Sequence, residues 1–235
     1  ARCHASVTHP AYCAGMTSSP LLRFGVIADP QYADRDPWLP AARHYRNSLA
    51  KLAEAISVLN DEDLAFVVTL GDLVDQGAES LEPVLQAYRA LRHESFLLPG
   101  NHDFAVPTEL LDQVHARLGM PSAWHAFERA GIRFVVIDGS EVSLFSTPQG
   151  HPRHVAAAER LASMEAAGAL NARPWNGAMG DEQFAWLESV LKQAKDQGEP
   201  VVVMGHYPLY PENEHNQWDC DRLLELFQRS GNVIA

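Results

Sequence analysis

Four short apolar runs in this chain each stop abruptly at polar residues, and this repeated pattern limits the folds that the sequence can adopt. The clearest run is Leu97-Leu98-Pro99-Gly100-Asn101-His102-Asp103, which reads as a buried strand that ends in a polar turn. The other runs cover residues 24–28, 64–70 and 201–204. Ligands bind at the carboxyl ends of strands in open α/β sheets, so the polar side chains after these runs are expected to converge on one site. The candidates are Asp29, Gln31, Asp72, Asn101, His102 and His206.

Helical spacing between the runs predicts that the first half of the chain alternates strands and helices. Residues 41–59 and 81–91 place apolar side chains three or four positions apart, as on one face of a helix. With strands expected over 21–28, 64–70 and 95–98, the order is βαβαβ. This order is typical of parallel strands that are joined by crossover helices.

The second half of the chain departs from this alternation. Residues 124–127 and 132–137 read as two consecutive strands with Gly131 at the turn, so we expect a second sheet and an α/β sandwich. Residues 139–180 read as a long loop with an Ala-rich helix near 155–167, which suits either a substrate lid or a purely structural loop. The elements expected after this loop are a helix capped by Asp181, a strand over 200–204 and a helix carrying Leu223, Leu224 and Phe227.

The length of 235 residues and the lack of a linker-like segment predict one domain over residues 21–235. Residues 1–20 are expected to be a disordered N-terminal extension, because residues 1–15 are rich in small and polar side chains and show no periodicity. A formal net charge of −12 argues against a long nucleic acid as a partner. A small phosphorylated ligand is compatible with this charge, because bound divalent cations can neutralise both carboxylates and phosphate.

The cysteines and the hydropathy pattern indicate a soluble protein of the cytoplasm. Cys3, Cys13 and Cys220 are an odd number without paired spacing, which suits a reducing compartment. The start of the chain has no apolar stretch long enough for a signal peptide, and no run of about 18 apolar residues suggests a membrane span. The sequence leaves the oligomeric state open.

The candidate residues offer oxygen and nitrogen atoms but no thiolate, which favours Mn²⁺ or Mg²⁺ over a structural zinc ion. A shared carboxylate suits two metals about 3.5–4 Å apart, which activate a water molecule and hold a phosphoryl oxygen. His102 directly follows a candidate ligand and could protonate a leaving group, with Asp75 orienting its ring. Singly, each residue has a simpler explanation: a turn or helix cap for Asp29 or Asn101, and a half-buried structural histidine for His206. Their joint occurrence at strand ends favours the metal site.

Four motifs together resemble those of the calcineurin-like metallophosphoesterase superfamily. They are Asp29-x-Gln31, Gly71-Asp72-Leu73-Val74-Asp75-x-Gly77, Gly100-Asn101-His102-Asp103 and Gly205-His206. The resemblance implies a four-layer α/β/β/α sandwich with a dinuclear metal centre, in which His102 is the general acid and Asp75 orients its ring. The implied ligands are Asp29 and Gln31 for the first metal, Asn101 and His206 for the second, and Asp72 for both.

Position 31 departs from the superfamily, which usually has histidine where this chain has Gln31. Gln31, Tyr32-Ala33-Asp34, residues 43–49 and residues 206–211 together are similar to the corresponding motifs of the Mn²⁺-dependent ADP-ribose/CDP-alcohol diphosphatase family. That resemblance implies hydrolysis of the phosphoanhydride bond of small nucleoside diphosphate compounds, with two Mn²⁺ ions activating the attacking hydroxide. Tyr32 would offer a stacking face to a nucleobase, and a packed structural aromatic is an equal alternative. The remaining alternatives are a cyclic nucleotide phosphodiesterase, a phosphomonoesterase and an inactive nucleotide-binding fragment.

The last motif of the superfamily, Gly-His-x-His, would follow a strand that begins at Asn232, and the sequence stops at Ala235. We therefore expect a sandwich that is incomplete at the C-terminus and lacks one ligand for each metal. We accordingly expect the 235-residue chain to bind metal weakly and to show little hydrolysis.

Overall fold

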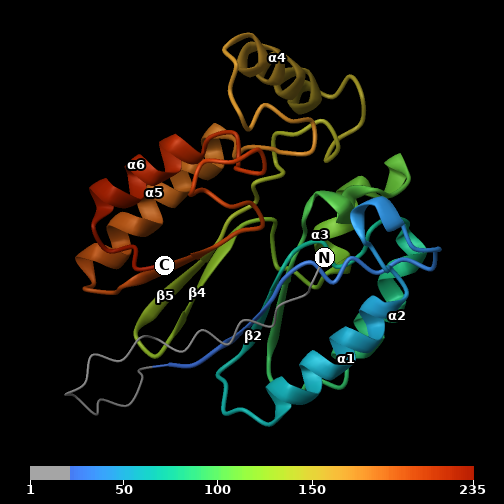
Figure 1. Ribbon diagram of the computed structural model, residues 1–235. Helices are drawn as coiled ribbons and strands as arrows, with labels where there is room; N and C mark the ends of the chain where they lie inside the picture. The colour runs from blue at the N-terminus through green and yellow to red at the C-terminus, as the bar shows by residue number, and fades with distance from the viewer. Residues whose placement is uncertain (1–21) are drawn as a thin grey trace.

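Two three-stranded sheets pack against each other, and helices cover their outer faces (Figure 1). The computed structural model describes residues 22–235, so the disordered extension predicted at residues 1–20 lies outside the described residues. The layers run helix, sheet, sheet, helix, which confirms the predicted four-layer α/β/β/α sandwich.

The first sheet contains three parallel strands in the order β1-β2-β3. They are β1 (Gly25–Ile27), β2 (Val67–Leu70) and β3 (Ser95–Leu98). The crossover helices are α1 (Asn47–Asn60) and α2 (Leu81–Tyr88). The apolar stripes of both helices pack on the outer face of this sheet in one cluster that includes Leu52, Ile56, Val84 and Leu97. The βαβαβ order that the sequence predicts is therefore confirmed.

The second sheet combines an antiparallel and a parallel pair. Its strands are β4 (His125–Arg129), β5 (Ile132–Val136) and β6 (Val201–Met204). Its covering helices are α5 (Asp181–Asp196) and α6 (Cys220–Ser230). The turn between β4 and β5 contains Gly131 at a φ of +74°, a conformation that glycine adopts without the steric cost of a side chain. Leu187, Leu191 and Leu223 are fully buried between these helices and the sheet.

Phenylalanine rings from both sheets fill the space between the two sheets. Phe66 of β2 and Phe134 of β5 are each 0% exposed, and their ring centroids lie 5.0 Å apart in an edge-to-face contact. Phe24, Phe96 and Phe127 contact the same two rings or each other. Such contacts add to the free energy gained by burying each ring, so this core fixes how one sheet lies on the other.

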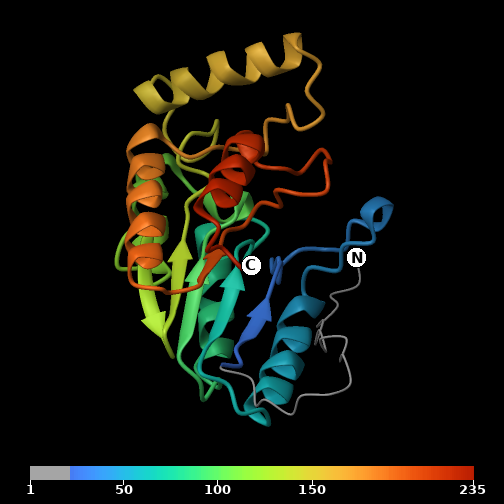
Figure 2. The same cartoon turned by 90° about the vertical axis from the view of Figure 1, so that its left-hand side faces the viewer.

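The remaining helices lie in the connections. They are α3 (Val114–Arg117), α4 (Pro152–Ala166) and the 3₁₀ helices Leu39–Ala41, Ala78–Ser80, Asn101–Phe104 and Thr108–Gln113. The helix α4 lies beyond the sheets, past the end at which β1, β2 and β3 finish (Figure 2). Its buried residues Ala157 and Leu161 pack in a separate cluster with Trp218.

The first predicted helix starts later than its periodicity indicates. It begins at Asn47 rather than at residue 41, because Trp38 and Arg43 form an antiparallel bridge around a short turn. The Trp38 N–H donates to the Arg43 carbonyl at 2.9 Å, and the Arg43 N–H donates to the Trp38 carbonyl at 3.1 Å. Pro40 is the second residue of the 3₁₀ turn Leu39–Ala41 in this loop, where its fixed φ is suitable.

Two further details of the prediction are corrected. The N-cap of α5 is Gly180, and Asp181 occupies the first helical turn. Its negative charge there still stabilises the helix by interacting with the positive end of the helix dipole. Between β3 and β4 the chain forms the 3₁₀ helix Thr108–Gln113, followed by the single turn of α3. The strand expected from Asn232 is represented by one parallel bridge between Val233 and Val201.

None of the helices within residues 22–235 combines the length and the apolar character that crossing a bilayer requires.

Candidate metal centre

Four strands, three from the first sheet and one from the second, end at the same edge of the sandwich. Asp29 follows β1, Asp72 follows β2, Asn101 follows β3 and His206 follows β6. Asp29, Asp72 and His206 each place a possible ligand atom within 4.8 Å of those of the other two. The structure therefore brings together donors that the sequence separates widely.

Three of the candidate ligands have left-handed backbone conformations. The φ angles are +52° at Asp29, +47° at Gln31 and +53° at Asp72. This conformation costs a non-glycine residue about 1–2 kcal/mol, so surrounding contacts must hold it in place. The Gln31 N–H donates to the Asp72 carbonyl at 2.8 Å, and the Asp29 N–H donates to the Gly71 carbonyl at 3.3 Å. The turns after β1 and β2 thus stabilise each other in the conformation that aims their side chains into the site.

Two glycines allow these turns to approach closely. A Cβ atom on Gly71 would lie 2.6 Å from the Gly100 nitrogen, and Gly71 also has a φ of +92°. A Cβ atom on Gly100 would lie 2.2 Å from Asp72 Oδ1 and 2.6 Å from His206 Cε1. Any other residue at position 100 would displace the carboxylate or the imidazole.

The surroundings of His206 test whether the site suits a metal ion. Its Nδ1 lies 2.7 Å from the Leu70 carbonyl oxygen, which can only accept, so Nδ1 carries the proton of the neutral ring. The lone pair of Nε2 then faces Asn101 Oδ1 at 3.3 Å and Asp72 Oδ1 at 3.6 Å. A cation satisfies such a group of facing acceptors, and a backbone carbonyl is a usual partner for the other nitrogen of a metal-bound histidine. The donor set fits a divalent metal.

The two carboxylates also create an excess of negative charge. Loss of solvent around the carboxylate raises the pKa of Asp29, and the charge of Asp72 raises it further, even though Asp29 as a residue is exposed. The Gln31 amide nitrogen donates to Asp72 Oδ2 at 3.0 Å, which places this side chain beside the carboxylate. A divalent cation between Asp29 and Asp72 would offset their repulsion.

Asp103 has a function in the fold that the sequence did not reveal. Its buried carboxylate accepts hydrogen bonds from the backbone N–H groups of Gly100 at 2.8 Å, Val74 at 3.1 Å and Leu73 at 3.3 Å. It therefore ties the turn after β3 to the turn after β2. Burial, and secondly the charge of Asp72, raise the pKa of Asp103 to about 7. The one feature of the sequence that pointed to Asp103 is its position directly after His102.

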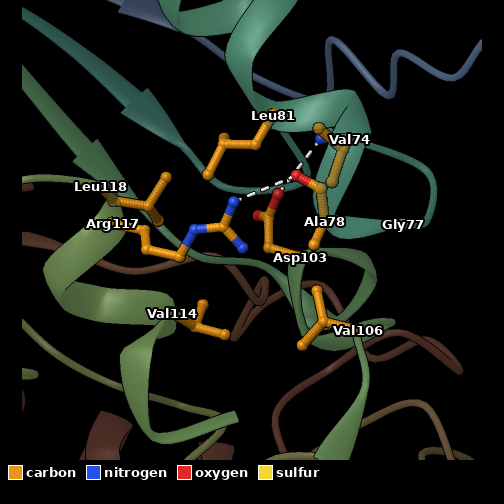
Figure 3. A pocket seen from close by; sticks show the side chains of 9 residues that line it. All are labelled: Val74, Gly77, Ala78, Leu81, Asp103, Val106, Val114, Arg117 and Leu118. Atoms are coloured by element: carbon orange, nitrogen blue, oxygen red, sulfur yellow. Dashed lines mark hydrogen bonds between the residues drawn. The ribbon is translucent and has the colours of Figure 1, made fainter. Parts of the chain in front are cut away.

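A small cavity of about 20 Å³ lies behind Asp103 (Figure 3). Apolar side chains line most of it, and the Arg117 guanidinium reaches across it to donate to the Ala78 carbonyl at 3.1 Å. This volume is near that of one water molecule, so the cavity cannot hold a substrate.

His102 is held by the backbone as well as by a side chain. Its Nδ1 lies 2.9 Å from the Asp75 carbonyl oxygen and 3.5 Å from the Asp75 carboxylate, and its N–H donates to Asp72 Oδ1 at 3.0 Å. Nδ1 therefore carries a proton toward Asp75, which leaves Nε2 as the atom that can exchange a proton with a ligand. The Asp75 carboxylate, expected to orient this ring, is also contacted by Arg35 and Arg43.

Tyr32 lies next to the site but is partly used in packing. Its ring is half-buried against the core cluster under α1 and α2, and its backbone forms a bridge with Val74. This is the structural alternative that the sequence left open, and its proposed stacking on a nucleobase stays a prediction.

Comparison with known proteins relates this chain to one family by sequence and to one solved structure by fold. The family model described as calcineurin-like phosphoesterase matches residues 22–235. An Arabidopsis thaliana protein named manganese-dependent ADP-ribose/CDP-alcohol diphosphatase is 32% identical, over 91% of this chain and 78% of its own length. A human protein of the same name is 29% identical, over 85% of this chain and 70% of its own length. The solved structure of a dimetal phosphatase from Danio rerio shares the fold with a TM-score of 0.79 at 24% identity, covering 92% of this chain and 80% of that one.

The family match therefore extends over all of the described residues, and the layers of the sandwich and the donors at its strand ends agree with it. This chain belongs to the calcineurin-like phosphoesterase family, whose members are metal-dependent hydrolases of phosphoric ester and diphosphate bonds.

Proposed function

We propose that this protein hydrolyses the diphosphate bond of small nucleotide compounds of the ADP-ribose or CDP-alcohol type, with two Mn²⁺ ions as cofactors. The observation that carries the proposal is the cluster of Asp29, Asp72 and His206, in which His206 Nε2 lies 3.6 Å from Asp72 Oδ1. The names of the relatives with 32% and 29% identity support this choice of substrate class and metal.

The proposed ligand assignment follows the positions of the side chains. Asp72 is central, since Gln31 contacts its Oδ2 and His206 lies near its Oδ1. Asp29 and Gln31 would serve the metal on the β1 side. Asn101 and His206, whose Oδ1 and Nε2 lie 3.3 Å apart, would serve the metal on the other side. When bound, the two metals would supply the activated water and offset the charge of the phosphoryl group, and oxygen and nitrogen donors suit Mn²⁺.

His102 is the proposed proton donor to the leaving group. Its side chain is 26% exposed, so a substrate can reach it, and its backbone is bonded to Asp72 at the centre of the site. The Asp75 carbonyl fixes the proton on Nδ1 and keeps Nε2 directed outward. A positioned donor of this kind contributes about 10²–10⁴-fold to the rate.

The proposal includes a small substrate and a cytoplasmic location. The formal net charge of −12 would repel a polyanionic nucleic acid, whereas a single diphosphate can be neutralised at the metal centre. Cys220, the cysteine that lies within the described residues, is a free thiol, which is compatible with a reducing compartment.

Hydrolysis assays in Mn²⁺ buffer test the proposal. Whatever the absolute rate, we expect the relative rates to favour ADP-ribose and CDP-choline over cyclic AMP and p-nitrophenyl phosphate. The Asp72→Asn variant should lose this activity, whereas Asp63→Asn, a change of an exposed carboxylate in the loop before β2, should keep it. Faster cleavage of cyclic AMP would favour a cyclic nucleotide phosphodiesterase, and faster cleavage of p-nitrophenyl phosphate a phosphomonoesterase. Nucleotide binding without any hydrolysis would identify a binding protein.

A further inference from the structure

Two arginine side chains converge on one buried carboxylate beside the candidate metal centre. Arg35 Nη1 lies 3.2 Å from Asp75 Oδ2, and Arg43 Nη1 lies 3.4 Å from Asp75 Oδ1. The Asp75 side chain is 5% exposed, whereas those of Arg35 and Arg43 are 42% and 33% exposed. One arginine would suffice to neutralise Asp75. The second arginine adds a positive charge beyond the one that Asp75 requires.

Both guanidinium groups are fixed in position, yet most of their donors remain available. The guanidinium carbon of Arg35 lies 4.8 Å from the centroid of the Tyr45 ring, and that of Arg43 lies 5.9 Å from the centroid of the Trp38 ring. A guanidinium has five N–H donors, and within residues 22–235 each of these two groups donates one hydrogen bond, to Asp75. The free edges of a fixed guanidinium suit phosphate oxygens, which arginine binds through two parallel hydrogen bonds.

Asp75 places these cations next to the proposed proton donor. His102 Nδ1 lies 3.5 Å from Asp75 Oδ1, the same oxygen that Arg43 contacts. Arg43 is also within electrostatic reach of the metal ligands. Burial and Asp72 raise the pKa of Asp29, whereas the charge of Arg43 is among those that lower it. The arginines therefore lie beside the proposed proton donor, at the edge of the site.

We propose that Arg35 and Arg43 bind the phosphoryl group that leaves when a diphosphate is cleaved, so that the site prefers diphosphates to simple phosphate esters. This inference rests on the proposed function. Hydrolysis breaks the bond between one phosphorus and the bridging oxygen, and it joins the oxygen of water to that phosphorus. The bridging oxygen departs with the second phosphoryl group and gains a proton.

The position of the second phosphoryl group follows from this chemistry. If His102 delivers the proton from Nε2, the bridging oxygen must lie at that atom, and the phosphoryl group attached to it would lie within reach of the exposed edges of Arg35 and Arg43. Arg35 and Arg43 provide the charge that this leaving group needs. The alcohol of a simple ester carries no phosphate to that place, so the arginines would add nothing to its binding.

Equilibrium binding to the full chain in Mn²⁺ buffer tests the inference with two probes. The first probe is α,β-methylene-ADP, in which a methylene group replaces the bridging oxygen and prevents cleavage there, and the second is AMP. Arg43→Gln and Arg35→Gln should each raise the Kd for the first probe by about 10–100-fold, as expected for loss of a charged hydrogen bond. The Kd for AMP should rise by less than about threefold. Arg43→Lys, which keeps the charge but not the paired donors, should give an intermediate Kd.

Arg46→Gln is the matched control, because that guanidinium is already paired with the exposed carboxylates of Asp34 and Asp36. It should leave both Kd values unchanged. The inference is contradicted if Arg43→Gln loses equal affinity for the two probes or loses none for α,β-methylene-ADP. It is also contradicted if the unaltered chain does not bind α,β-methylene-ADP.

The same measurements separate this inference from the proposed function. If the unaltered chain cleaves ADP-ribose and the arginine variants bind both probes normally, the function stands and the inference fails. If the unaltered chain does not cleave ADP-ribose but its affinity for α,β-methylene-ADP depends on Arg43, the function fails and the phosphate-binding pair stands.

Discussion

His206 Nε2 lies 3.6 Å from Asp72 Oδ1, although the two residues follow strands of different sheets. The centre thus depends on the contact between the sheets as well as on the turns within each of them. Asp72 is the carboxylate that the other donors surround, since Gln31 contacts one oxygen, and His206 and the His102 N–H lie at the other.

Replacement of Asp72 by Asn should remove more bound metal than any other single change of a proposed ligand. The substitution takes away the charge that two metals would share and places an amide N–H₂ group toward His206 or Gln31. Equilibrium dialysis against Mn²⁺ followed by elemental analysis measures the metal content. Asp29→Asn and His206→Asn are the comparison variants. An Asp72→Asn protein with unchanged Mn²⁺ content would show that Asp72 is not the shared ligand.

His102→Ala should keep its metals and lose about 10²–10⁴-fold in kcat, because it removes the proposed proton donor and leaves the proposed metal ligands in place. The loss should be largest for substrates whose leaving groups are strong bases, which most need a proton. Steady-state rates with a series of leaving groups, combined with metal analysis, provide the test. Loss of metal together with activity would instead make His102 a ligand.

Gly100→Ala should disrupt the centre without a change in any ligand. Its Cβ would lie 2.2 Å from Asp72 Oδ1 and 2.6 Å from the Asp72 nitrogen, so the carboxylate must move. We expect Mn²⁺ affinity to fall by at least about tenfold, a cost of about 1.4 kcal/mol. Gly119→Ala is the control, since its Cβ meets nothing within 4 Å.

The control variant separates two effects of adding a side chain. Gly119 has a φ of +75°, so its replacement should cost about 1–2 kcal/mol of folding stability and leave metal affinity intact. Equal metal affinities in the two glycine variants would mean that the close approach at Gly100 is not required for binding.

Asp103→Asn should destabilise the metal-free chain by about 1–3 kcal/mol, because an amide cannot accept all three backbone hydrogen bonds and turns an N–H₂ group toward donors. Urea unfolding followed by circular dichroism measures the difference. Asp112→Asn, at an exposed position in the 3₁₀ helix that follows, serves as the control. If both variants unfold at the same urea concentration, the carboxylate of Asp103 is not what ties the two turns together.

Gln31→His should shift metal preference from Mn²⁺ toward Zn²⁺ and Co²⁺, since imidazole is a softer donor than an amide oxygen. Rates with each ion at saturation give the rank order. An unchanged order would mean that Gln31 does not tune the site.

The positions of the candidate ligands could be predicted from sequence because they depend on local patterns. An apolar run such as Leu97–Leu98, followed by a glycine and polar residues, indicates where a buried strand stops, and the family motifs then indicate which side chains meet. The same reasoning placed the strands of both sheets within a few residues. It failed at residues 38–43, where a turn closed by backbone hydrogen bonds replaced the start of a helix.

The contacts that support the site could not be predicted in this way. Asp103 binds backbone groups of a turn about thirty residues away, and Arg35 and Arg43 reach Asp75 across a similar separation. Such contacts depend on how the turns lie against each other in three dimensions. The left-handed conformation of Asp29 is likewise imposed by its neighbours, since aspartate by itself favours other regions.

The division of the donors between two sheets has a consequence for stability. A metal bound to both Asp72 and His206 would cross-link the two sheets that pack on either side of the phenylalanine core. Its binding free energy then opposes separation of the sheets and adds about 2.7 kcal/mol at a metal concentration 100 times the Kd. Manganese should therefore raise the melting temperature of the sandwich. Conversely, a substitution that weakens the Phe66–Phe134 contact between the sheets should lower the affinity for Mn²⁺.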